Sequence, residues 1–142
     1  MTRAPRVSLD TTAYAHMRRG HAGVTELIAR AEIVYLPSIV LGELEAGFLL
    51  GRRTAENRTT LGEFLDEPFT AVISVDEQVA RAYGRLFAEL RRAGTPIPVN
   101  DIWIAAATIA MGAHLLTFDR DFDKIDNLGH TCFEESAEDR SR

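Results

Sequence analysis

The chain has 142 residues, of which 46% are hydrophobic and 26% charged, and its formal net charge is −5. This size and composition are typical of one globular domain with a single core. No apolar run approaches the roughly 18 residues of a membrane span, and residues 1–6 lack the apolar stretch of a signal peptide. We therefore expect one cytoplasmic domain over residues 1–135, no membrane association, and a polar tail over residues 136–142.

Short apolar runs alternate with longer stretches of helical spacing along the chain. In chain order this pattern predicts strand 7–10, helices 13–19 and 24–30, strand 33–36, helices 38–50 and 54–65, strand 70–75, a helix between Ser74 and Gly94, helix 102–111, strand 114–117, a loop or short helix 119–127, and an edge strand 131–133. The alternation predicts an α/β fold. Its mostly parallel central sheet has four to five strands flanked by helices.

Several helix starts are marked by residues that can cap a helix. Ser38 and Asn100 are the expected N-caps of their helices, and Ser74 with Glu77 forms a capping-box pattern. The helix over 102–111 is apolar on nearly all sides, so we expect it to be buried.

The lone cysteine and the arginine pairs limit the possible partners. Cys132 has no second cysteine for a disulfide or a zinc cage, and we expect it to be a small buried hydrophobe. The acidic net charge argues against nucleic-acid binding, which normally needs a basic surface. Arginines can nevertheless bind phosphate, and three pairs are candidate contacts as well as ordinary solvated faces. These pairs are Arg18 with Arg19, Arg52 with Arg53, and Arg91 with Arg92.

Four acidic residues stand where such a fold would bring distant segments together. Asp10 ends the first strand and Asp119 follows the fourth, and ligands in open α/β sheets collect at the carboxyl ends of strands. Glu43 lies in the helical sector of apolar residues, and Asp101 lies where a helix dipole stabilises an anion. Carboxylates without a neutralising lysine favour Mg²⁺ or Mn²⁺, which prefer hard oxygen ligands.

Most of these acids also have a purely structural explanation. Asp10 can be a turn residue, Asp101 can cap its helix, and Asp119 can belong to a solvated acidic turn in which Asp121 is an equal candidate. Glu43 fits such a role least, because a buried ionised glutamate needs a partner. The chain contains no nucleotide-binding loop, no serine-hydrolase motif and no histidine pair at metal-ligand spacing.

The order of the motifs resembles the PIN-domain nucleases, and most closely the VapC toxins of bacterial toxin-antitoxin pairs. The motifs are Asp10-Thr11-Thr12, Glu43-Leu44-Glu45-Ala46-Gly47, Asn100-Asp101-Ile102-Trp103-Ile104-Ala105-Ala106 and Leu116-Thr117-Phe118-Asp119-Arg120-Asp121-Phe122. The resemblance covers residues 7–128 and implies a three-layer PIN-like fold. It assigns catalytic and metal-binding roles to Asp10, Glu43, Asp101 and Asp119, with Asp121 as the alternative to Asp119. It also implies that Thr12 and Thr117 orient carboxylates or water.

The resemblance further implies an endoribonuclease, dependent on Mg²⁺ or Mn²⁺, that cleaves a structured RNA such as tRNA or rRNA and thereby inhibits translation and growth. RNA would contact Arg18, Arg19, Arg52 and Arg53. A cognate VapB-like antitoxin would dock on the apolar helix over 39–50, and the chain would form a homodimer.

Two alternatives to a toxin stay open. One is a PIN-like nuclease without a toxin role. The other is a non-catalytic, doubly wound binding or receiver module. A receiver needs a lysine after its last strand, and the only lysine, Lys124, lies in the acidic loop.

Overall fold

The computed structural model describes residues 4–135, so the polar tail expected over 136–142 lies outside the described part. Five strands form one sheet in the order β3-β2-β1-β4-β5, and all neighbours are parallel. The strands are β1 Arg6–Leu9, β2 Ile33–Pro37, β3 Thr70–Ile73, β4 His114–Thr117 and β5 His130–Cys132. The helices are α1 Thr11–Arg18, α2 Ala22–Arg30, α3 Ser38–Leu50, α4 Thr54–Leu65, α5 Glu77–Ala93, α6 Val99–Ala110 and the 3₁₀ helix η1 Arg120–Lys124. The predicted α/β class and order of elements are confirmed.

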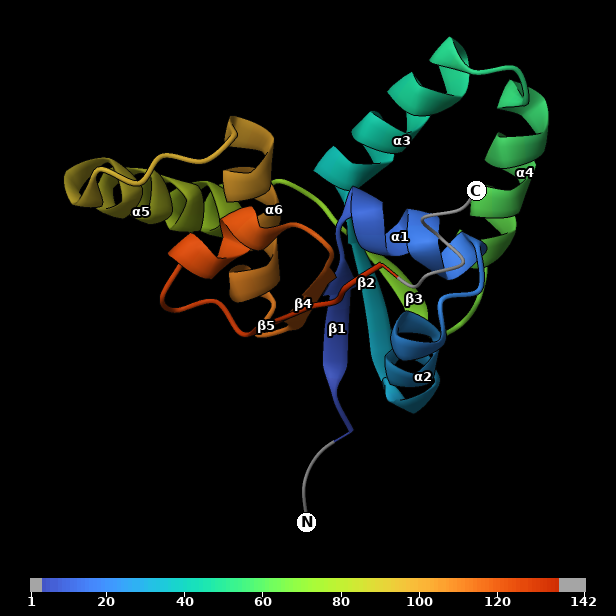
Figure 1. Cartoon of the computed structure of the whole chain (residues 1–142), viewed down its shortest axis with the longest axis horizontal. Coiled ribbons are helices and arrows are strands. Elements are labelled where there is room, and N and C mark those ends of the chain that lie inside the picture. Colours follow the sequence, from blue (N-terminus) through green and yellow to red (C-terminus); the bar gives the residue numbers. More distant parts are fainter. Residues whose placement is uncertain (1–3, 136–142) are drawn as a thin grey trace.

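Helices cover both faces of the sheet and make three layers (Figure 1). Crossovers between parallel strands are nearly always right-handed, so the direction of travel along the sheet decides which face receives each helix. The chain moves one way from β1 through β2 to β3, which places α1 to α4 on one face. It then returns to β4 on the far side of β1, which places α5, α6 and η1 on the other face.

The boundary between β1 and β4 is where the chain changes direction along the sheet. The chain continues from β1 to β2 on one side, whereas it continues from β4 to β5 on the other. Ligands of open α/β sheets bind at such a switch point, outside the carboxyl ends of the strands. Asp10 directly follows β1 and Asp119 follows β4, so the fold brings both acids to this position.

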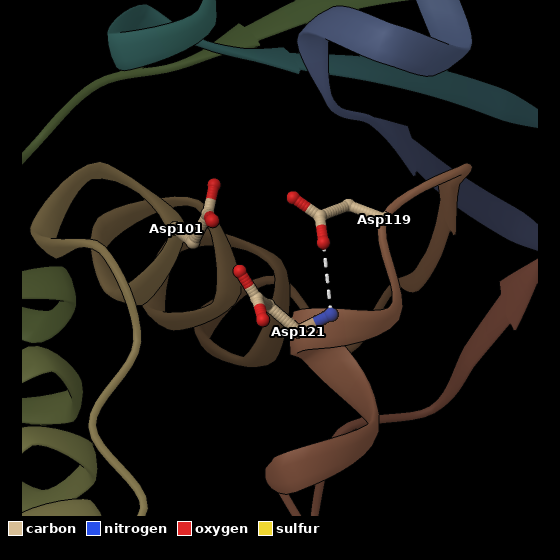
Figure 2. Close-up of side chains that lie close together, drawn as sticks. All are labelled: Asp101, Asp119 and Asp121. Carbon is tan, nitrogen blue, oxygen red and sulfur yellow. Dashed lines mark hydrogen bonds between the residues drawn. The ribbon is translucent and has the colours of Figure 1, made fainter.

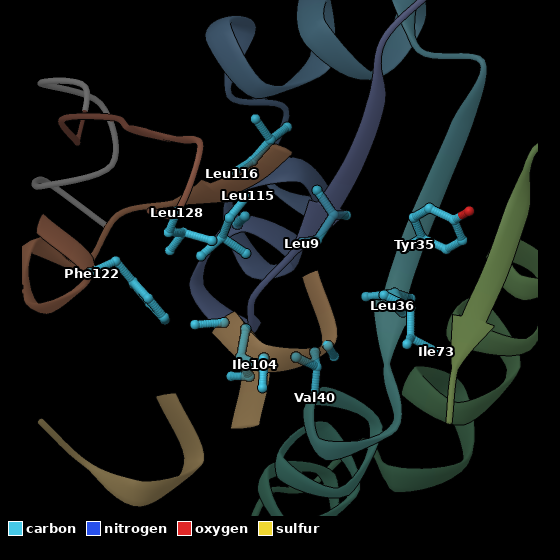
Figure 3. Close-up of a cluster of buried hydrophobic side chains, with 14 of the residues drawn as sticks. Leu9, Tyr35, Leu36, Val40, Ile73, Ile104, Leu115, Leu116, Phe122 and Leu128 are labelled. Carbon is cyan, nitrogen blue, oxygen red and sulfur yellow. The ribbon is translucent and has the colours of Figure 1, made fainter. Parts of the chain in front are cut away.

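The strands and α6 supply most of the core (Figure 3). Leu9, Leu36 and Leu115 have no exposed surface, because a parallel sheet with helices on both faces buries successive side chains. On α6, Ile102 and Ile104 are also buried, and so are the three alanines that follow them. The expectation of a buried, nearly all-apolar helix here is confirmed.

Three expected N-caps are wrong. The helices α3 and α6 follow Pro37 and Pro98, which occupy the N-cap positions and offer no side-chain acceptor, so Ser38 and Asn100 lie inside the helices. The helix α5 begins after Asp76, whose carboxylate accepts a hydrogen bond from the backbone N–H of Val79 at 2.9 Å. Ser74 is too far upstream for that bond, because β3 ends at residue 73 and the turn before α5 takes two more residues.

Cys132 is half-buried rather than buried, because β5 is an edge strand whose residues all keep some exposed surface. Within residues 4–135, no helix has both the length and the apolar character needed to cross a membrane.

The two candidate caps of α5 can be compared directly. Asp76→Ala removes the acceptor at the helix start and is expected to lower the free energy of unfolding by about 1 kcal/mol. Ser74→Ala is the matched control and should leave that free energy unchanged, because Ser74 is exposed and makes no cap. Urea unfolding followed by circular dichroism measures both. Equal losses for the two variants would contradict the assignment of Asp76 as the cap.

Candidate metal centre

Asp10 is the most deeply buried acid of the centre, with 3% of its surface exposed. Its Oδ1 accepts hydrogen bonds from the backbone N–H of Ala13 at 2.8 Å and from the Thr12 hydroxyl at 2.7 Å. Its Oδ2 accepts one from the Thr117 hydroxyl. Burial raises the pKa of Asp10 above its ordinary value, although these three hydrogen bonds oppose the shift. Asp10 is therefore both the N-cap of α1 and a fixed part of the acidic centre.

Thr12 and Thr117 tie the end of β1 to the loop after β4, which agrees with the supporting role expected for them. The backbone N–H of Phe118 donates to the Thr12 hydroxyl oxygen at 3.0 Å. The backbone N–H of Asp119 donates to the Thr117 hydroxyl oxygen at 2.9 Å. Each threonine thus donates to Asp10 and accepts from the loop that carries Asp119, which sets the position of one acid relative to the other.

Glu43 faces the start of α1. Its Oε1 accepts a hydrogen bond from the Thr11 hydroxyl at 2.7 Å, and the side chain is half-buried. The surrounding sector of α3 is less buried than expected. Gly47 is exposed, with open space where a Cβ would stand, and Leu50 is 90% exposed. Only Val40 and Leu44 of this helix are buried, because its second half projects beyond the sheet (Figure 1).

Three carboxylates form the closest group in the described part of the chain (Figure 2). Asp101, Asp119 and Asp121 each offer an oxygen, and these atoms all lie within 4.8 Å of one another. Asp101 comes from the first turn of α6, as expected. Asp119 caps η1 by accepting from the backbone N–H of Asp121 at 2.8 Å. Asp119 and Asp121 therefore both lie close to Asp101, and the geometry excludes neither of them as a metal ligand.

All five acids interact electrostatically, because the other four affect the pKa of Asp101. The pKa of Asp101 is raised to about 7, first by burial and then by the charges of Asp119, Glu43, Asp10 and Asp121. Asp10 and Glu43 lie outside the closest group, yet their charges reach Asp101. Lys124 lies 3.5 Å from an oxygen of Asp121, and the pKa of Asp101 is raised despite this cation.

This donor set suits a hard divalent cation. Its atoms are carboxylate oxygens, which Mg²⁺ and Mn²⁺ prefer, and no cysteine or histidine is among them. Their mutual repulsion is what a bound cation relieves. The raised pKa of Asp101 reports that repulsion on one member of the group.

Two residues beside the acids are not among those predicted from the sequence. The helix α1 begins at Thr11 rather than at residue 13, and this earlier start turns the Thr11 hydroxyl toward Glu43. His16 is buried, donates from Nδ1 to the Thr12 carbonyl at 2.9 Å, and stacks on Phe118 with ring centroids 3.7 Å apart. In the sequence, the available signal for His16 was its spacing of four residues from Thr12, because residues four apart are neighbours on a helix.

The four arginines proposed for RNA contact are exposed. None of them forms an ion pair with a described residue, in contrast to Arg30, Arg58, Arg81 and Arg120, which each pair with a carboxylate. Arg18 and Arg19 lie at the end of α1, whereas Arg52 and Arg53 lie in the turn between α3 and α4.

The chain is similar to known proteins over most of its length. The PIN domain family matches residues 7–128. Ribonuclease VapC2 of Rickettsia felis is 34% identical over 104 residues, which cover 72% of this chain and 76% of that protein. Ribonuclease VapC4 of Mycobacterium tuberculosis is 36% identical over 88 residues, which cover 59% of this chain and 65% of that protein.

Solved structures show the same fold. The crystal structure of VapBC2 from Rickettsia felis bound to a DNA fragment from its promoter superposes with a TM-score of 0.79 and 28% identity. The match covers 91% of this chain and 99% of that one. The acidic centre at the switch point, the family match and the shared fold together show that this chain belongs to the PIN-domain family, among the VapC ribonucleases.

Proposed function

We propose that this chain is a divalent-metal-dependent endoribonuclease and the toxin of a toxin-antitoxin pair, which cleaves a structured RNA such as tRNA or rRNA and so inhibits growth. The observation that carries the proposal is the convergence of the Asp101, Asp119 and Asp121 carboxylates at the switch point of the sheet. The similarity to proteins named ribonuclease VapC supports the reaction type. The family assignment leaves the receiver-module alternative without support.

Each acid has a distinct part in the proposed site. Asp101, Asp119 and Asp121 would hold the cation, and Asp10 and Glu43 would complete its negative surroundings. A bound Mg²⁺ or Mn²⁺ would activate water and stabilise charge on the phosphodiester. The chain's own contribution is to hold the carboxylates still. The threonine hydroxyls fix Asp10 and Glu43, η1 fixes Asp119 and Asp121, and the first turn of α6 carries Asp101.

The proposed partners rest on the neighbours and on the exposed surface. Several solved neighbours are VapBC toxin-antitoxin complexes. On α3, Leu49 is 60% and Leu50 is 90% exposed, and exposed leucines of this kind favour contact with a partner. We propose that a VapB-like antitoxin silences the enzyme, with a cation from the antitoxin entering the acidic centre, and that the chain forms a homodimer.

Binding of the cation is tested by thermal melting. Because a ligand that binds only the folded state stabilises it by mass action, millimolar Mn²⁺ is expected to raise the Tm by several degrees, about 2–4 °C per kcal/mol. Asp101→Asn should remove most of this shift. Asp126→Asn, an exposed acid on the neighbouring loop, is the matched control and should keep it. An unchanged Tm for the parent protein would contradict the metal centre.

The raised pKa of Asp101 predicts how stability depends on pH without metal. The unfolded chain loses this proton near pH 4, whereas the folded chain keeps it up to about pH 7, so the native state loses stability over that interval. Asp101→Asn should therefore stabilise the protein in EDTA most at pH 8 and less than half as much at pH 5, where most of the interval between the two pKa values has not yet been crossed. Urea unfolding at both pH values measures the difference. A gain of the same size at pH 5 would show that charge repulsion is not its cause.

Activity and toxicity are tested with the same pair of variants. Asp101→Asn is expected to lower RNA cleavage about 100-fold or more, since changes in the surroundings of a metal alone cost 10–100-fold. Asp126→Asn should cleave like the parent. Induced expression of the parent in a bacterial host should arrest growth, and Asp101→Asn should relieve the arrest. Cleavage without growth arrest would favour a PIN nuclease that is not a toxin.

A further inference from the structure

A cavity of about 420 Å³ opens between α1, α3 and α4. Its volume lies within the range of sites that hold small molecules. It is separate from the group of three aspartates, since none of them lines it. Tyr14, Leu44 and Phe48 supply apolar walls, and Arg18, Arg19 and Asn57 supply polar groups.

Two residues that line the cavity are close in the chain to acids of the centre. Leu44 follows Glu43 in α3, and Tyr14 lies one helical turn after Asp10. From there the cavity extends along α1 to Arg18, which is eight residues beyond Asp10. At 1.5 Å per residue this is about 12 Å along the helix axis. The acidic centre and the cavity therefore lie along the same helix, α1.

The charge of the cavity is opposite to that of the acidic centre. Arg18 and Arg19 form no ion pair with a described residue, and Glu56 is the one acid in the lining. Burial raises the pKa of Tyr14, and the charge of Arg18 opposes this shift. The cavity thus combines two available guanidinium groups with an apolar floor.

We propose that this cavity is a subsite for one nucleotide of the RNA substrate, with its phosphate on Arg18 and Arg19 and its base against Phe48. The inference rests on the proposed function and adds where the substrate is held. A nucleotide supplies both an anion for the two guanidinium groups and a flat face for the aromatic ring. Asn57 is placed to donate to or accept from a base edge.

The position of the nucleotide follows from the helix geometry. The path of about 12 Å along α1 places the subsite more than one nucleotide from the cleaved bond. The subsite would therefore select the sequence or shape of the RNA at a distance from the cut, while the acidic centre acts on any phosphodiester brought to it.

The first test measures RNA binding without cleavage. The full chain carrying Asp101→Asn is titrated in EDTA with a fluorescent single-stranded RNA, at several salt concentrations. Adding Arg18→Ala and Arg19→Ala is expected to weaken binding at least about tenfold. The steepness of log K against log salt should fall by about 0.7, because the subsite neutralises one phosphate and each phosphate contact of a single strand contributes about 0.7. Both arginines are exposed, so their loss leaves the core intact, and a melting curve confirms the fold.

The matched control removes two exposed arginines from the opposite face. Arg81→Ala with Arg85→Ala changes the net charge equally on α5 and should leave affinity and slope within about twofold of the parent. An equal effect of the two double variants would show a general charge effect and overturn the subsite. Failure of the Asp101→Asn parent to bind RNA would also overturn it.

A second pair of variants tests the base contact. Phe48→Leu keeps an apolar side chain but removes the aromatic face, and should weaken RNA binding about fivefold or more. Phe87→Leu on α5, a partly exposed phenylalanine outside the cavity, should have no such effect. RNA bearing 4-thiouridine should crosslink within the cavity in the parent. Equal binding by the two phenylalanine variants would overturn the base contact.

The outcomes separate this inference from the proposed nuclease activity. Variant-dependent RNA binding by a protein that cleaves no RNA would support the subsite and count against the nuclease. Normal cleavage and RNA binding by the Arg18→Ala, Arg19→Ala protein would support the nuclease and overturn the subsite. If that protein instead loses only its complex with a co-expressed antitoxin, the cavity is a protein docking groove and the nucleotide assignment is wrong.

Discussion

The gathering of five acids at one point of the sheet is the constraint that the surrounding structure has to accommodate. The pKa of Asp101 is raised for this reason, first by burial and then by the charges of four neighbouring acids. Such a cluster persists only where the scaffold holds each member in place. The core beneath it, built from the strands and the buried face of α6, is apolar and closely packed. The apolar core thus supports a site whose carboxylates repel one another and favour the binding of a cation.

The scaffold acts through short polar bonds as well as through packing. Thr12 and Thr117 bridge the first strand and the loop after the fourth, and Thr11 bridges α1 and α3. These segments are distant in sequence but adjacent at the switch point, so each hydroxyl connects two elements. His16 extends the arrangement by stacking on Phe118, the residue between Thr117 and Asp119. A change at His16 would therefore reach the acids through the backbone, without any contact to substrate.

In the proposed function, the acidic centre and the cationic cavity divide RNA recognition between them along one helix, α1. At its first residues, α1 presents the hydroxyls that hold the acids, and at its last residues it presents Arg18 and Arg19. This polarity reconciles a net charge of −5 with a nucleic-acid substrate, because the cations are concentrated where a strand leaving the acidic centre would pass. The helix axis then sets the separation between the reacting phosphate and the recognised nucleotide.

Local hydrophobic periodicity was enough to predict the alternation of strands and helices, the parallel sheet and the buried character of α6. The ends of those elements also indicated Asp10, Asp101 and Asp119. The structure was needed to establish that Asp76 caps α5, through a local bond to Val79. Tertiary contacts were needed to establish that both Asp119 and Asp121 approach Asp101, and that Thr11 holds Glu43. The same holds for the sector of α3 around Glu43, which is largely exposed. Each of these features depends on the exact start of an element or on which distant segment lies beside it, and neither is encoded in local periodicity.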